Sequence, residues 1–351
     1  MRPCRHIAIV GAGIAGLACA RTLAQAGDAV TVFEKHAQVG GRMATRASPF
    51  GDFDHGVQYF TVRDTRLAQV LQTTADLCKP WSANTVRVLD AFGRTVAAAP
   101  PTGEPHWVAT PDMQALPARW AAPLQDAGSL QLQTRVTRIE RGGSRRGAWS
   151  LHTVHPDTDG PHQRRRVAGF DAVLLAIAAA QAHELLQNSD LAADWSARMQ
   201  TVEVDPCWTL MLAFPQAMQP GLGTLGPQWN AARSTHHRIA WLARESSKPA
   251  RAPIERWTVQ ASGAWSREHL HDEPQRVQDK LQRAFSEVTG IRAQPAHAQV
   301  HRWPFAQTIR PLGQSHLWDA RSALGVCGDW CLGQRVEDAF VSGLELALAA
   351  R

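Results

Sequence analysis

Three glycines near the start of the chain, Gly11, Gly13 and Gly16, have the spacing of a turn that binds a dinucleotide. Gly11 allows a tight turn, Gly13 lets the backbone approach a pyrophosphate, and Gly16 lets the next helix pack against the strand. Glu34 ends a second apolar segment, where its carboxylate can accept hydrogen bonds from the hydroxyls of an unphosphorylated ribose. The pattern predicts a nucleotide cofactor site, and a plain packing turn is the alternative interpretation.

Two later motifs distinguish between possible cofactors. Gly40-Gly41-Arg42 supplies a second close backbone approach and a cation near a diphosphate. Gly328-Asp329 follows a predicted strand, where a carboxylate can bind ribityl hydroxyls. The helix predicted from about Val336 would direct its N–H groups at the pyrimidine edge of a flavin. Three motifs in this order favour FAD over NAD, and no sequence context supports covalent attachment.

A strand, a helix and a second strand must hold the first motif. The apolar run His6–Val10 precedes Gly11, and a helix over 17–26 leads to the strand Ala29–Phe33. Together these segments predict a parallel βαβ unit. The sheet and its helices are expected to continue with a buried strand at Phe170–Ile177, a strand at Gly325-Val326 and a final helix over 336–350.

The remaining periodic segments complete two predicted domains. Helices are expected over 111–127 and 273–289, and strands over 130–140, 149–154, 165–167, 208–214, 238–244 and 256–262. The predicted class is α/β, with a Rossmann-type FAD-binding domain and an inserted α+β substrate domain built on a mixed sheet. The FAD-binding domain is assigned to 1–65, 111–180 and 321–351, and the substrate domain to 66–110 and 181–320.

Composition and charge exclude several classes of protein. The chain has 351 residues and a formal net charge of +6, but its arginines are spread along the sequence, which argues against nucleic-acid binding. No apolar run reaches the roughly 20 residues of a membrane span. The early glycine motif leaves no room for a signal peptide. The six cysteines lack paired spacing, which predicts reduced thiols in a cytoplasmic protein without a metal site.

The aromatic residues are distributed unevenly. The chain contains 13 Trp but only 1 Tyr, which is Tyr59, and the first tryptophan is Trp81. The segment predicted to bind the nucleotide therefore contains no tryptophan, whereas tryptophans gather in the predicted substrate domain. This asymmetry indicates two differently built halves.

The cofactor motifs resemble those of the flavin-dependent amine oxidase superfamily. Other motifs are similar to the bacterial renalase-like branch of that superfamily, and the resemblance extends from residue 7 to about 343. These motifs are Phe53-Asp54-His55-Gly56-Val57-Gln58-Tyr59-Phe60-Thr61, Trp241-Leu242-Ala243-Arg244, Ser246-Ser247-Lys248-Pro249, Trp257, Ala264-Trp265-Ser266, His301-Arg302-Trp303 and Cys327-Gly328-Asp329-Trp330.

The resemblance implies a fold, a reaction and a set of contacts. The fold is an FAD domain of the p-hydroxybenzoate hydroxylase type with a mixed-sheet substrate domain. The reaction oxidises isomeric dihydro-NAD(P) to NAD(P)+, and dioxygen reoxidises the flavin to give hydrogen peroxide. Tyr59 and Trp303 would flank the substrate, with Trp241 and Arg302 also in the pocket. Besides the glycines Gly11, Gly13, Gly16, Gly41 and Gly328, the implied cofactor residues are Ala15, Glu34, Lys35, Arg42, Val57, Gln58, Val136, Asp329 and Val336.

Two positions depart from the pattern of the relatives. Ala178 stands where many have proline, and Pro304 stands where many have a basic residue after the tryptophan. Pro304 removes a backbone donor and restricts Trp303 to an extended conformation. These departures concern the substrate pocket rather than the flavin site.

Alternative functions remain open at this point. Hydride transfer from a dihydropyridine needs proximity and orientation but no base at the reacting carbon. Amine oxidation requires a neutral amine, and many amine oxidases place a lysine and two aromatic rings near the flavin. None of the four lysines, Lys35, Lys79, Lys248 and Lys280, has the sequence context of such a partner. A flavin amine oxidase or dehydrogenase acting on a small apolar amine is the first alternative, and a non-catalytic FAD-binding sensor is the second.

Overall fold

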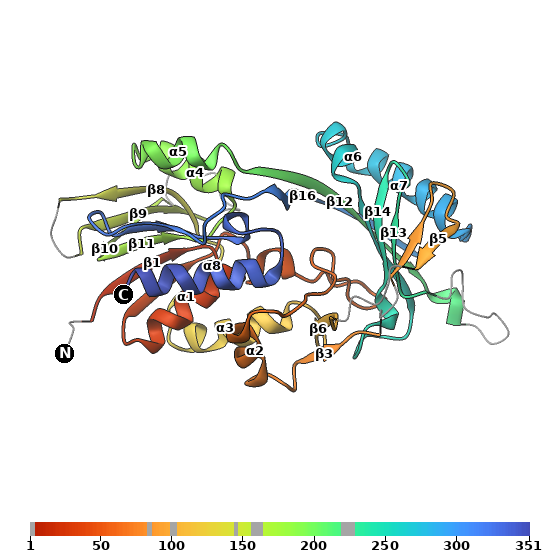
Figure 1. The fold of residues 1–351 in the computed structure, drawn as a ribbon, viewed down its shortest axis with the longest axis horizontal. Helices are drawn as coiled ribbons and strands as arrows, with labels where there is room; N and C mark the ends of the chain where they lie inside the picture. Colours follow the sequence, from red (N-terminus) through yellow and green to blue (C-terminus); the bar gives the residue numbers. More distant parts are fainter. Residues whose placement is uncertain (1–3, 83–85, 99–103, 144–146, 156–163, 219–228) are drawn as a thin grey trace. The chain divides into compact units, whose positions relative to one another are not determined.

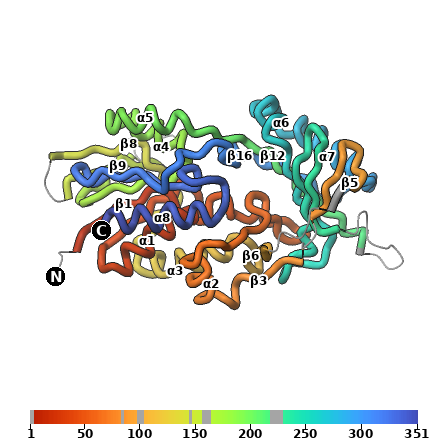
Figure 2. Tube along the Cα trace, in the orientation of Figure 1, coloured from red at the N-terminus to blue at the C-terminus, as the bar shows by residue number. Residues whose placement is uncertain are grey.

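The structure, a computed structural model, describes residues 4–82, 86–98, 104–143, 147–155, 164–218 and 229–351 (Figure 1). The chain divides into two compact units. Unit 1 comprises Met1–Gly41, Pro117–Glu203 and Thr308–Arg351, and unit 2 comprises Arg42–Leu116 and Val204–Gln307. Each unit is assembled from separated parts of the sequence, as the mixed colours of the trace in Figure 2 show.

Unit 1 is built on a six-stranded sheet with the order β17-β18-β11-β1-β2-β7. All neighbouring strands are parallel except β17 and β18, which are antiparallel. The strands are β1 (His6–Val10), β2 (Ala29–Phe33), β7 (Leu130–Gln131), β11 (Ala172–Leu175), β17 (Leu317–Asp319) and β18 (Leu324–Val326). This sheet confirms the predicted α/β class and the Rossmann-type unit.

One face of this sheet packs against a smaller antiparallel sheet and two helices. The smaller sheet contains β8 (Arg135–Arg141), β9 (Trp149–Val154) and β10 (Arg165–Phe170), and the helices are α4 (Ala179–Gln187) and α5 (Ala193–Met199). Ala8 and Val10 of β1 and Val173 of β11 share a buried apolar cluster with Trp149 of β9 and Leu186 of α4. Alternate side chains of the parallel strands therefore anchor this layer.

Helices from opposite ends of the chain lie side by side in unit 1. They are α1 (Ile14–Gln25) and α8 (Val336–Ala349), which Figure 2 shows next to each other. The contact depends on Gly343 of α8, because a Cβ atom there would collide with the backbone carbonyl of Ala15 in α1. The C-terminal helix is thus held against the helix that begins at the first glycine motif.

Unit 2 is built on a seven-stranded sheet with the order β16-β12-β15-β14-β13-β4-β5. From β12 to β5 the neighbouring strands are antiparallel except β13 and β4, which are parallel, so the sheet is mixed as predicted. The strands are β4 (Arg87–Leu89), β5 (Thr95–Ala98), β12 (Glu203–Phe214), β13 (Ala231–Ser234), β14 (Ile239–Arg244), β15 (Glu255–Ala261) and β16 (His297–Arg310). Pro304 lies in β16, the edge strand, where a missing backbone donor is tolerated.

The two faces of this sheet have different partners. Leu210 and Leu212 of β12 pack with Phe285 of the amphipathic helix α7 (Pro274–Thr289). Met211 and Ala213, which alternate with them, pack with Phe53. Because successive strand residues point to opposite faces, one face is covered by α7 and the other receives the segment around Phe53.

Shorter elements complete both units. They are α2 (Thr65–Gln72), α3 (Ala115–Asp126), α6 (Gly263–Glu268), β3 (Cys78–Pro80), β6 (Trp107–Ala109), and the single turns η1 (Gly41–Met43), η3 (Pro215–Met218), η4 (Glu245–Ser247) and η5 (Asp329–Cys331). β3 and β6 form a two-stranded antiparallel sheet.

The predicted elements are mostly present, with some different borders. The predicted strand over 130–140 is wrong as one element, because it forms β7 and β8 in two different sheets. Gln133 between them has a positive φ of 48°, and its N–H donates to His36 O at 3.0 Å, so the chain turns there. Helix α1 begins at Ile14, earlier than predicted, and β10 continues to Phe170.

The borders of the two units differ from the predicted domain borders. Residues 42–65 belong to unit 2, whereas 181–203 and 308–320 belong to unit 1. The reason at 42–65 is that Phe53 packs against the seven-stranded sheet. The reason at 181–203 is that α4 and α5 cover the apolar face of the six-stranded sheet.

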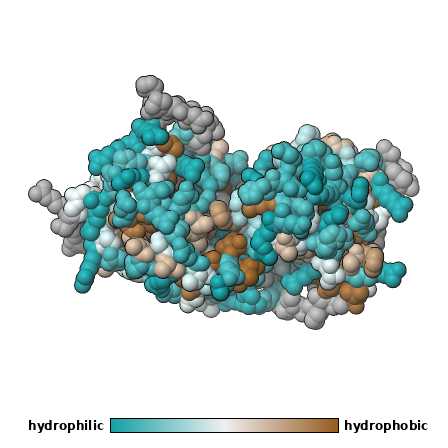
Figure 3. Space-filling model, turned by 90° about the horizontal axis from the view of Figure 1, so that it is seen from above, coloured by the Kyte–Doolittle hydropathy of each residue, from teal (hydrophilic) through white to brown (hydrophobic). Residues whose placement is uncertain are grey.

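The surface view shows one face on which hydrophilic side chains predominate and hydrophobic ones gather in a few patches (Figure 3). Among the residues that the structure describes, none of the helices has the length and apolar character needed to cross a membrane.

Replacing Gly343 by valine is expected to destabilise the protein. The added side chain would collide with the Ala15 carbonyl, which belongs to rigid helical backbone. We expect the free energy of unfolding to fall by about 1–3 kcal/mol or more, measured by thermal and denaturant unfolding. Leu348→Ala on the exposed side of the same helix is the control and should change it by less than about 0.5 kcal/mol. Equal effects of the two substitutions would contradict this account of the α1–α8 contact.

Candidate functional site

The three glycines of the first motif have different structural roles. Gly11 has a φ of +103°, and a Cβ atom there would lie 2.5 Å from Ala176 O. A Cβ atom at Gly16 would collide with Gly11 O, so the turn and the helix can only approach each other without it. Gly13 differs, because nothing lies within 4 Å of the position its Cβ would take. The fold therefore requires Gly11 and Gly16, and leaves open space at Gly13.

The start of α1 next to this space has the properties of an anion site. Gly13 is the N-cap residue, and no side chain caps the helix. The N–H groups of a first helical turn carry a partial positive charge and favour a phosphate. Gly40 and Gly41 border the same turn, since Gly40 N donates to Ala12 O at 2.9 Å and a Cβ at Gly41 would lie 3.6 Å from Gly13 Cα. The first two glycine motifs are thus brought together.

Glu34 holds an ionised carboxylate at the end of β2. Its Oε2 accepts from Ala12 N at 2.9 Å, and its Oε1 accepts from His36 N at 2.9 Å. Burial raises the pKa of Glu34, but the hydrogen bonds from His36 and Ala12 outweigh burial and leave the pKa below its ordinary value. A carboxylate, an uncapped helix end and the space at Gly13 fit the ribose and diphosphate of FAD. Lys35 beside Glu34 is half-buried.

The C-terminal motif lies in unit 1 as well. Gly328 N donates to Ser342 Oγ at 2.9 Å, and Ser342 Oγ donates to Ser315 O at 2.6 Å, so α8 fixes the turn before Asp329. Asp329 is buried, and Thr308 Oγ1 donates to its Oδ2 at 3.4 Å. Val336 begins α8, as predicted, and both Val336 and Val136 in β8 are buried.

Three predicted cofactor residues, Arg42, Val57 and Gln58, belong to unit 2. Arg42 Nη1 donates to Ala306 O at 2.9 Å, and Val57 N donates to Arg42 O at 2.8 Å. The side-chain amide of Gln58 is engaged by protein groups, which leaves its backbone for any cofactor contact. The segment around these residues is irregular rather than a strand, with isolated bridges at Phe53 and Phe60.

Tyr59 belongs to a group of four aromatic rings in unit 2. Its ring centroid lies 4.0 Å from that of His106, 5.7 Å from Trp241 and 6.4 Å from Trp81. Trp241 projects from β14 on the face of the sheet opposite Leu242, which packs toward α7. The predicted pocket residues Tyr59 and Trp241 are therefore neighbours, and we call these four residues the Tyr59 group.

Trp303 belongs to a second set of rings. Its centroid lies 4.9 Å from His55 and 4.4 Å from His301, and its indole Nε1 donates to His55 O at 3.0 Å. The structure thus places Tyr59 and Trp303 in separate ring groups of the same unit. Arg302 precedes Trp303 in β16. Its Nη1 donates to Leu270 O at 2.9 Å and its guanidinium lies over the Trp208 ring, apart from both groups.

His55 is held neutral in this second group. Burial, followed by the neighbouring His301 and Arg46, lowers the pKa of His55 to about 3. A group with this pKa is unprotonated over the physiological range and supplies no proton there. Among the residues that the structure describes, no set of three His, Cys, Asp or Glu side chains is arranged to bind a metal ion.

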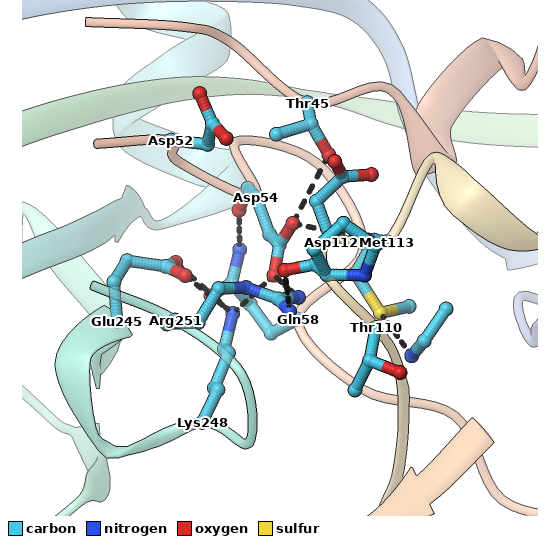
Figure 4. A network of polar contacts seen from close by, with 12 residues as sticks. Thr45, Asp52, Asp54, Gln58, Thr110, Asp112, Met113, Glu245, Lys248 and Arg251 are labelled. Atoms are coloured by element: carbon cyan, nitrogen blue, oxygen red, sulfur yellow. Dashed lines mark hydrogen bonds and ion pairs between the residues drawn. The ribbon is translucent and has the colours of Figure 1, made fainter. Parts of the chain in front are cut away.

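A buried charge network is the feature that sequence reasoning missed (Figure 4). Lys248 and Asp54 are fully buried and paired at 3.1 Å, and Lys248 also lies 3.0 Å from the carboxylate of Glu245. Arg251 Nη2 approaches Asp54 Oδ2 at 2.6 Å. Lys248 Nζ donates in addition to Gln58 Oε1 at 3.2 Å. We call Asp54, Gln58, Glu245, Lys248 and Arg251 the Lys248 network.

The two carboxylates of the Lys248 network have pKa values shifted in opposite directions. Burial raises the pKa of Asp54, but the positive charges of Lys248 and Arg251 more than offset it and bring the pKa down to about 2. Burial raises the pKa of Glu245 above its ordinary value, and the attraction of Lys248 only partly opposes this. The sequence signal for the network was weak: Asp54 and Lys248 each lie in a motif that resembles the renalase-like branch, but nothing in the sequence pairs the two motifs.

Family models match most of the chain. Residues 9–74 match a model described as an NAD(P)-binding Rossmann-like domain, and residues 95–350 match one described as flavin containing amine oxidoreductase. Among curated proteins, the chain is 29% identical over 216 residues to the tRNA 5-methylaminomethyl-2-thiouridine biosynthesis bifunctional protein MnmC of Magnetococcus marinus, covering 50% of this chain and 30% of that protein. It is 46% identical over 48 residues to the putative L-amino-acid oxidase YobN of Bacillus subtilis, covering 14% and 10%. The chain thus spans less than a third of these relatives.

Solved structures share the fold over the whole chain. A putative protoporphyrinogen oxidase from Exiguobacterium sp. 255-15 has a TM-score of 0.76 at 14% identity, with 98% of each chain covered. Cyclohexylamine oxidase from Brevibacterium oxydans IH-35A has a TM-score of 0.73 at 15% identity, with 99% of each chain covered. At these identities the likeness concerns the fold alone.

Replacing Gly13 by leucine should remove the flavin without unfolding the protein. The side chain would fill the open space at the start of α1, where we expect the diphosphate to bind. The purified variant should be colourless, with the far-UV circular dichroism and melting temperature of the wild-type apoprotein. Gly16→Leu is the matched contrast, since its collision with Gly11 O should disrupt folding itself. A yellow, fully loaded Gly13→Leu protein would refute the assignment of this turn.

His55 should make the protein less stable in acid. Its pKa in the folded state is about 3, against an ordinary value of 6.5, so the unfolded chain binds the proton more readily between these values. The free energy of unfolding should therefore fall as pH decreases from about 6.5, by at most about 1.4 kcal/mol per pH unit from this residue. His55→Phe, which keeps an aromatic ring, should flatten the slope in urea titrations. An unchanged slope would contradict the low pKa.

Proposed function

Because the chain belongs to the flavin-containing amine oxidoreductase family, we propose that it is an FAD-dependent oxidase of isomeric dihydronicotinamide dinucleotides. In the proposed reaction a dihydro-NAD(P), reduced at an unusual ring position, gives up a hydride and becomes NAD(P)+. Dioxygen takes up the two electrons, with the hydride's proton and one from solvent, and becomes hydrogen peroxide. FAD, held noncovalently, supplies the hydride acceptor.

The proposed cofactor contacts follow from the fit described above. Gly13, Ala15 and the start of α1 would hold the diphosphate, and Glu34 would bind the adenosine ribose. Asp329 would bind the ribityl chain, and Val336 would present the start of α8 to the flavin. The remaining proposed contacts are Gly11, Gly16, Lys35, Gly41, Arg42, Val57, Gln58, Val136 and Gly328.

The Tyr59 group is the observation that carries the proposed substrate. Four flat rings from separate segments meet in unit 2, and such a set suits stacking with a dihydropyridine ring. Hydride loss from this ring needs no base at the reacting carbon. In agreement, His55 with its pKa of about 3 is only a weak base, and Lys248 Nζ is engaged with three protein groups rather than placed at a substrate. Trp303 is proposed as a further substrate contact.

Oxidation of a small amine is the second candidate function. It is supported by the family description and by shared fold with cyclohexylamine oxidase and putrescine oxidase. The aromatic rings of the Tyr59 group would also accept an apolar amine. Lys248 is the fully buried lysine, but it lies within a network of protein partners. This engagement favours the dihydronicotinamide substrate.

The proposed setting is the cytoplasm. All six cysteines are free thiols, and burial raises the pKa of Cys19 well above its ordinary value and that of Cys207 to about 12, so these thiols stay protonated. Free thiols are typical of a reducing compartment.

Anaerobic mixing separates the candidate functions. We expect 2-dihydro- or 6-dihydro-NAD to bleach the flavin absorbance rapidly in a stopped-flow instrument, whereas a panel of apolar amines leaves it unchanged. Bleaching by amines alone would replace the proposed function by the second candidate. Stable absorbance with every donor would indicate a flavin-binding sensor without turnover.

Substitutions at Tyr59 test the aromatic contact. Tyr59→Phe keeps the ring and should retain most of the activity, whereas Tyr59→Ala should lower kcat/KM by about 10- to 100-fold, because stacking and orientation are lost. The measurement is steady-state peroxide formation with dihydro-NAD, with the flavin content of each variant determined first. Wild-type kinetics in Tyr59→Ala would remove Tyr59 from the substrate site.

Charge reversal at Arg302 tests the one predicted pocket residue that lies apart from both ring groups. Because its guanidinium packs on Trp208 and Leu270 O, we expect Arg302→Glu to leave the KM for dihydro-NAD within about twofold of wild type. A large rise in KM would instead support a contact with the dinucleotide pyrophosphate.

A further inference from the structure

The ammonium group of Lys248 uses all of its hydrogen-bond donors within the protein. Its three N–H bonds have three acceptors, which are Asp54 Oδ2 at 3.1 Å, Gln58 Oε1 at 3.2 Å and Glu245 Oε1 at 3.0 Å. Its side chain has no exposed surface. A buried lysine with all three N–H groups engaged by the protein is not placed to contact a substrate. Its role must therefore be sought in the groups that it holds.

One of these groups is the chain immediately before Tyr59. The amide oxygen of Gln58 points to Lys248, while the amide nitrogen donates to Asp54 O and to Gly56 O. The orientation of the Gln58 side chain is thus fixed at both ends of its amide. Because Gln58 and Tyr59 are adjacent, this fixes the backbone from which the Tyr59 ring projects.

The second group is a ring next to Tyr59. Lys248 Nζ lies 5.5 Å from the centroid of the Trp81 ring, within the range of a cation–π interaction. The indole Nε1 of Trp81 donates at 3.0 Å to Ser247 Oγ, the residue before Lys248. Trp81 in turn lies 6.4 Å from Tyr59. Lys248 and its neighbour therefore reach the Tyr59 group from a second side.

The turn that carries Lys248 is itself fixed. Lys248 N donates to Glu245 O at 3.1 Å, and Ser247 Oγ donates to Arg244 O at 2.6 Å, which closes the turn η4 at the end of β14. The same strand carries Trp241 of the Tyr59 group. The turn, the Trp81 ring and the segment before Tyr59 thus form one connected arrangement. Figure 4 shows the part of it in which Lys248 meets Asp54, Gln58 and Glu245.

We propose that Lys248 is a positioning residue that sets the orientation of the Tyr59 ring through Gln58 and Trp81. Its catalytic consequence rests on the proposed function, in which Tyr59 contacts the substrate. The orientation itself does not rest on that function and can be measured separately.

The choice of variant follows from the charges. Asp54 keeps Arg251 at 2.6 Å and the N–H of Met113 at 2.9 Å when Lys248 is replaced. Glu245 would keep a neutral hydrogen bond from Thr258 and the electrostatic attraction of Arg256, but it would lose its ion pair and remain as a buried carboxylate. Combining Lys248→Met with Glu245→Gln removes that charge. The double variant therefore removes the ammonium without leaving the unpaired carboxylate.

Tyr59 offers a direct probe because it is the sole tyrosine of the chain. Expression with 3-fluorotyrosine gives a protein with one ¹⁹F resonance, which reports the surroundings of this ring without any turnover. We expect the wild type to show one resonance displaced from that of the unfolded chain. In the double variant it should move toward the unfolded position or split, while far-UV circular dichroism stays unchanged. Glu245→Gln alone and the exposed Lys79→Met, as controls, should keep the wild-type resonance.

A second variant tests the same proposal if the double variant does not fold. Gln58→Met removes the contact between Lys248 and the Tyr59 segment but leaves every charge of the network paired, so it should shift the same resonance. A wild-type resonance in the folded double variant, or in Gln58→Met, would overturn the proposal.

The kinetic arm uses the flavin-loaded enzyme with 6-dihydro-NAD. The double variant should lose about 10- to 100-fold in kcat, because a displaced ring misorients the donor, and Glu245→Gln should lose far less. An unchanged kcat together with a shifted resonance would overturn the catalytic part. If the wild type itself is not reduced by the donor, the proposed function fails, and the resonance alone decides the role of Lys248.

Discussion

The ion pair between the Lys248 ammonium and Asp54 is the interaction on which the arrangement of the Tyr59 group in unit 2 depends. Moving two charges out of water costs several kcal/mol, so the pair is stable only where further hydrogen bonds complete it. Arg251, Gln58 and Glu245 supply these bonds. The pair joins two segments 194 residues apart in sequence, and each of them leads to an aromatic ring of the Tyr59 group.

In unit 1 the important feature is the absence of side chains at three glycines. Gly11 and Gly16 allow the turn to close, and Gly13 leaves space in front of the positive end of α1. Glu34, whose pKa is lowered by its hydrogen bonds, places a carboxylate beside this turn. In the proposed function the backbone would bind a diphosphate and side chains would bind a flat donor ring, which would explain the lack of tryptophan in the first eighty residues.

Much of unit 1 was predictable because its signals are local. The strand–glycine–helix–strand pattern at the start of the chain and the C-terminal helix depend on neighbouring residues. The division of 130–140 into β7 and β8 was not predictable, because it depends on a hydrogen bond that Gln133 N donates to the distant His36 O. Nor was the Lys248 network, since a lysine before proline carries no signal of a partner 194 residues away. The ring neighbours of Tyr59 and of Trp303 likewise needed three-dimensional information, and the structure gives each residue its own ring group.

The central claim is that the chain removes a hydride from a dihydronicotinamide without help from a base. It is tested most directly by the rate of anaerobic flavin reduction with dihydro-NAD deuterated at the reacting ring carbon. The account predicts a slower rate with the deuterated donor, no slowing in deuterated water, and a rate independent of pH between 6 and 9. Reduction that slows in deuterated water and requires an ionising group, or no reduction by any dihydronicotinamide, would contradict it.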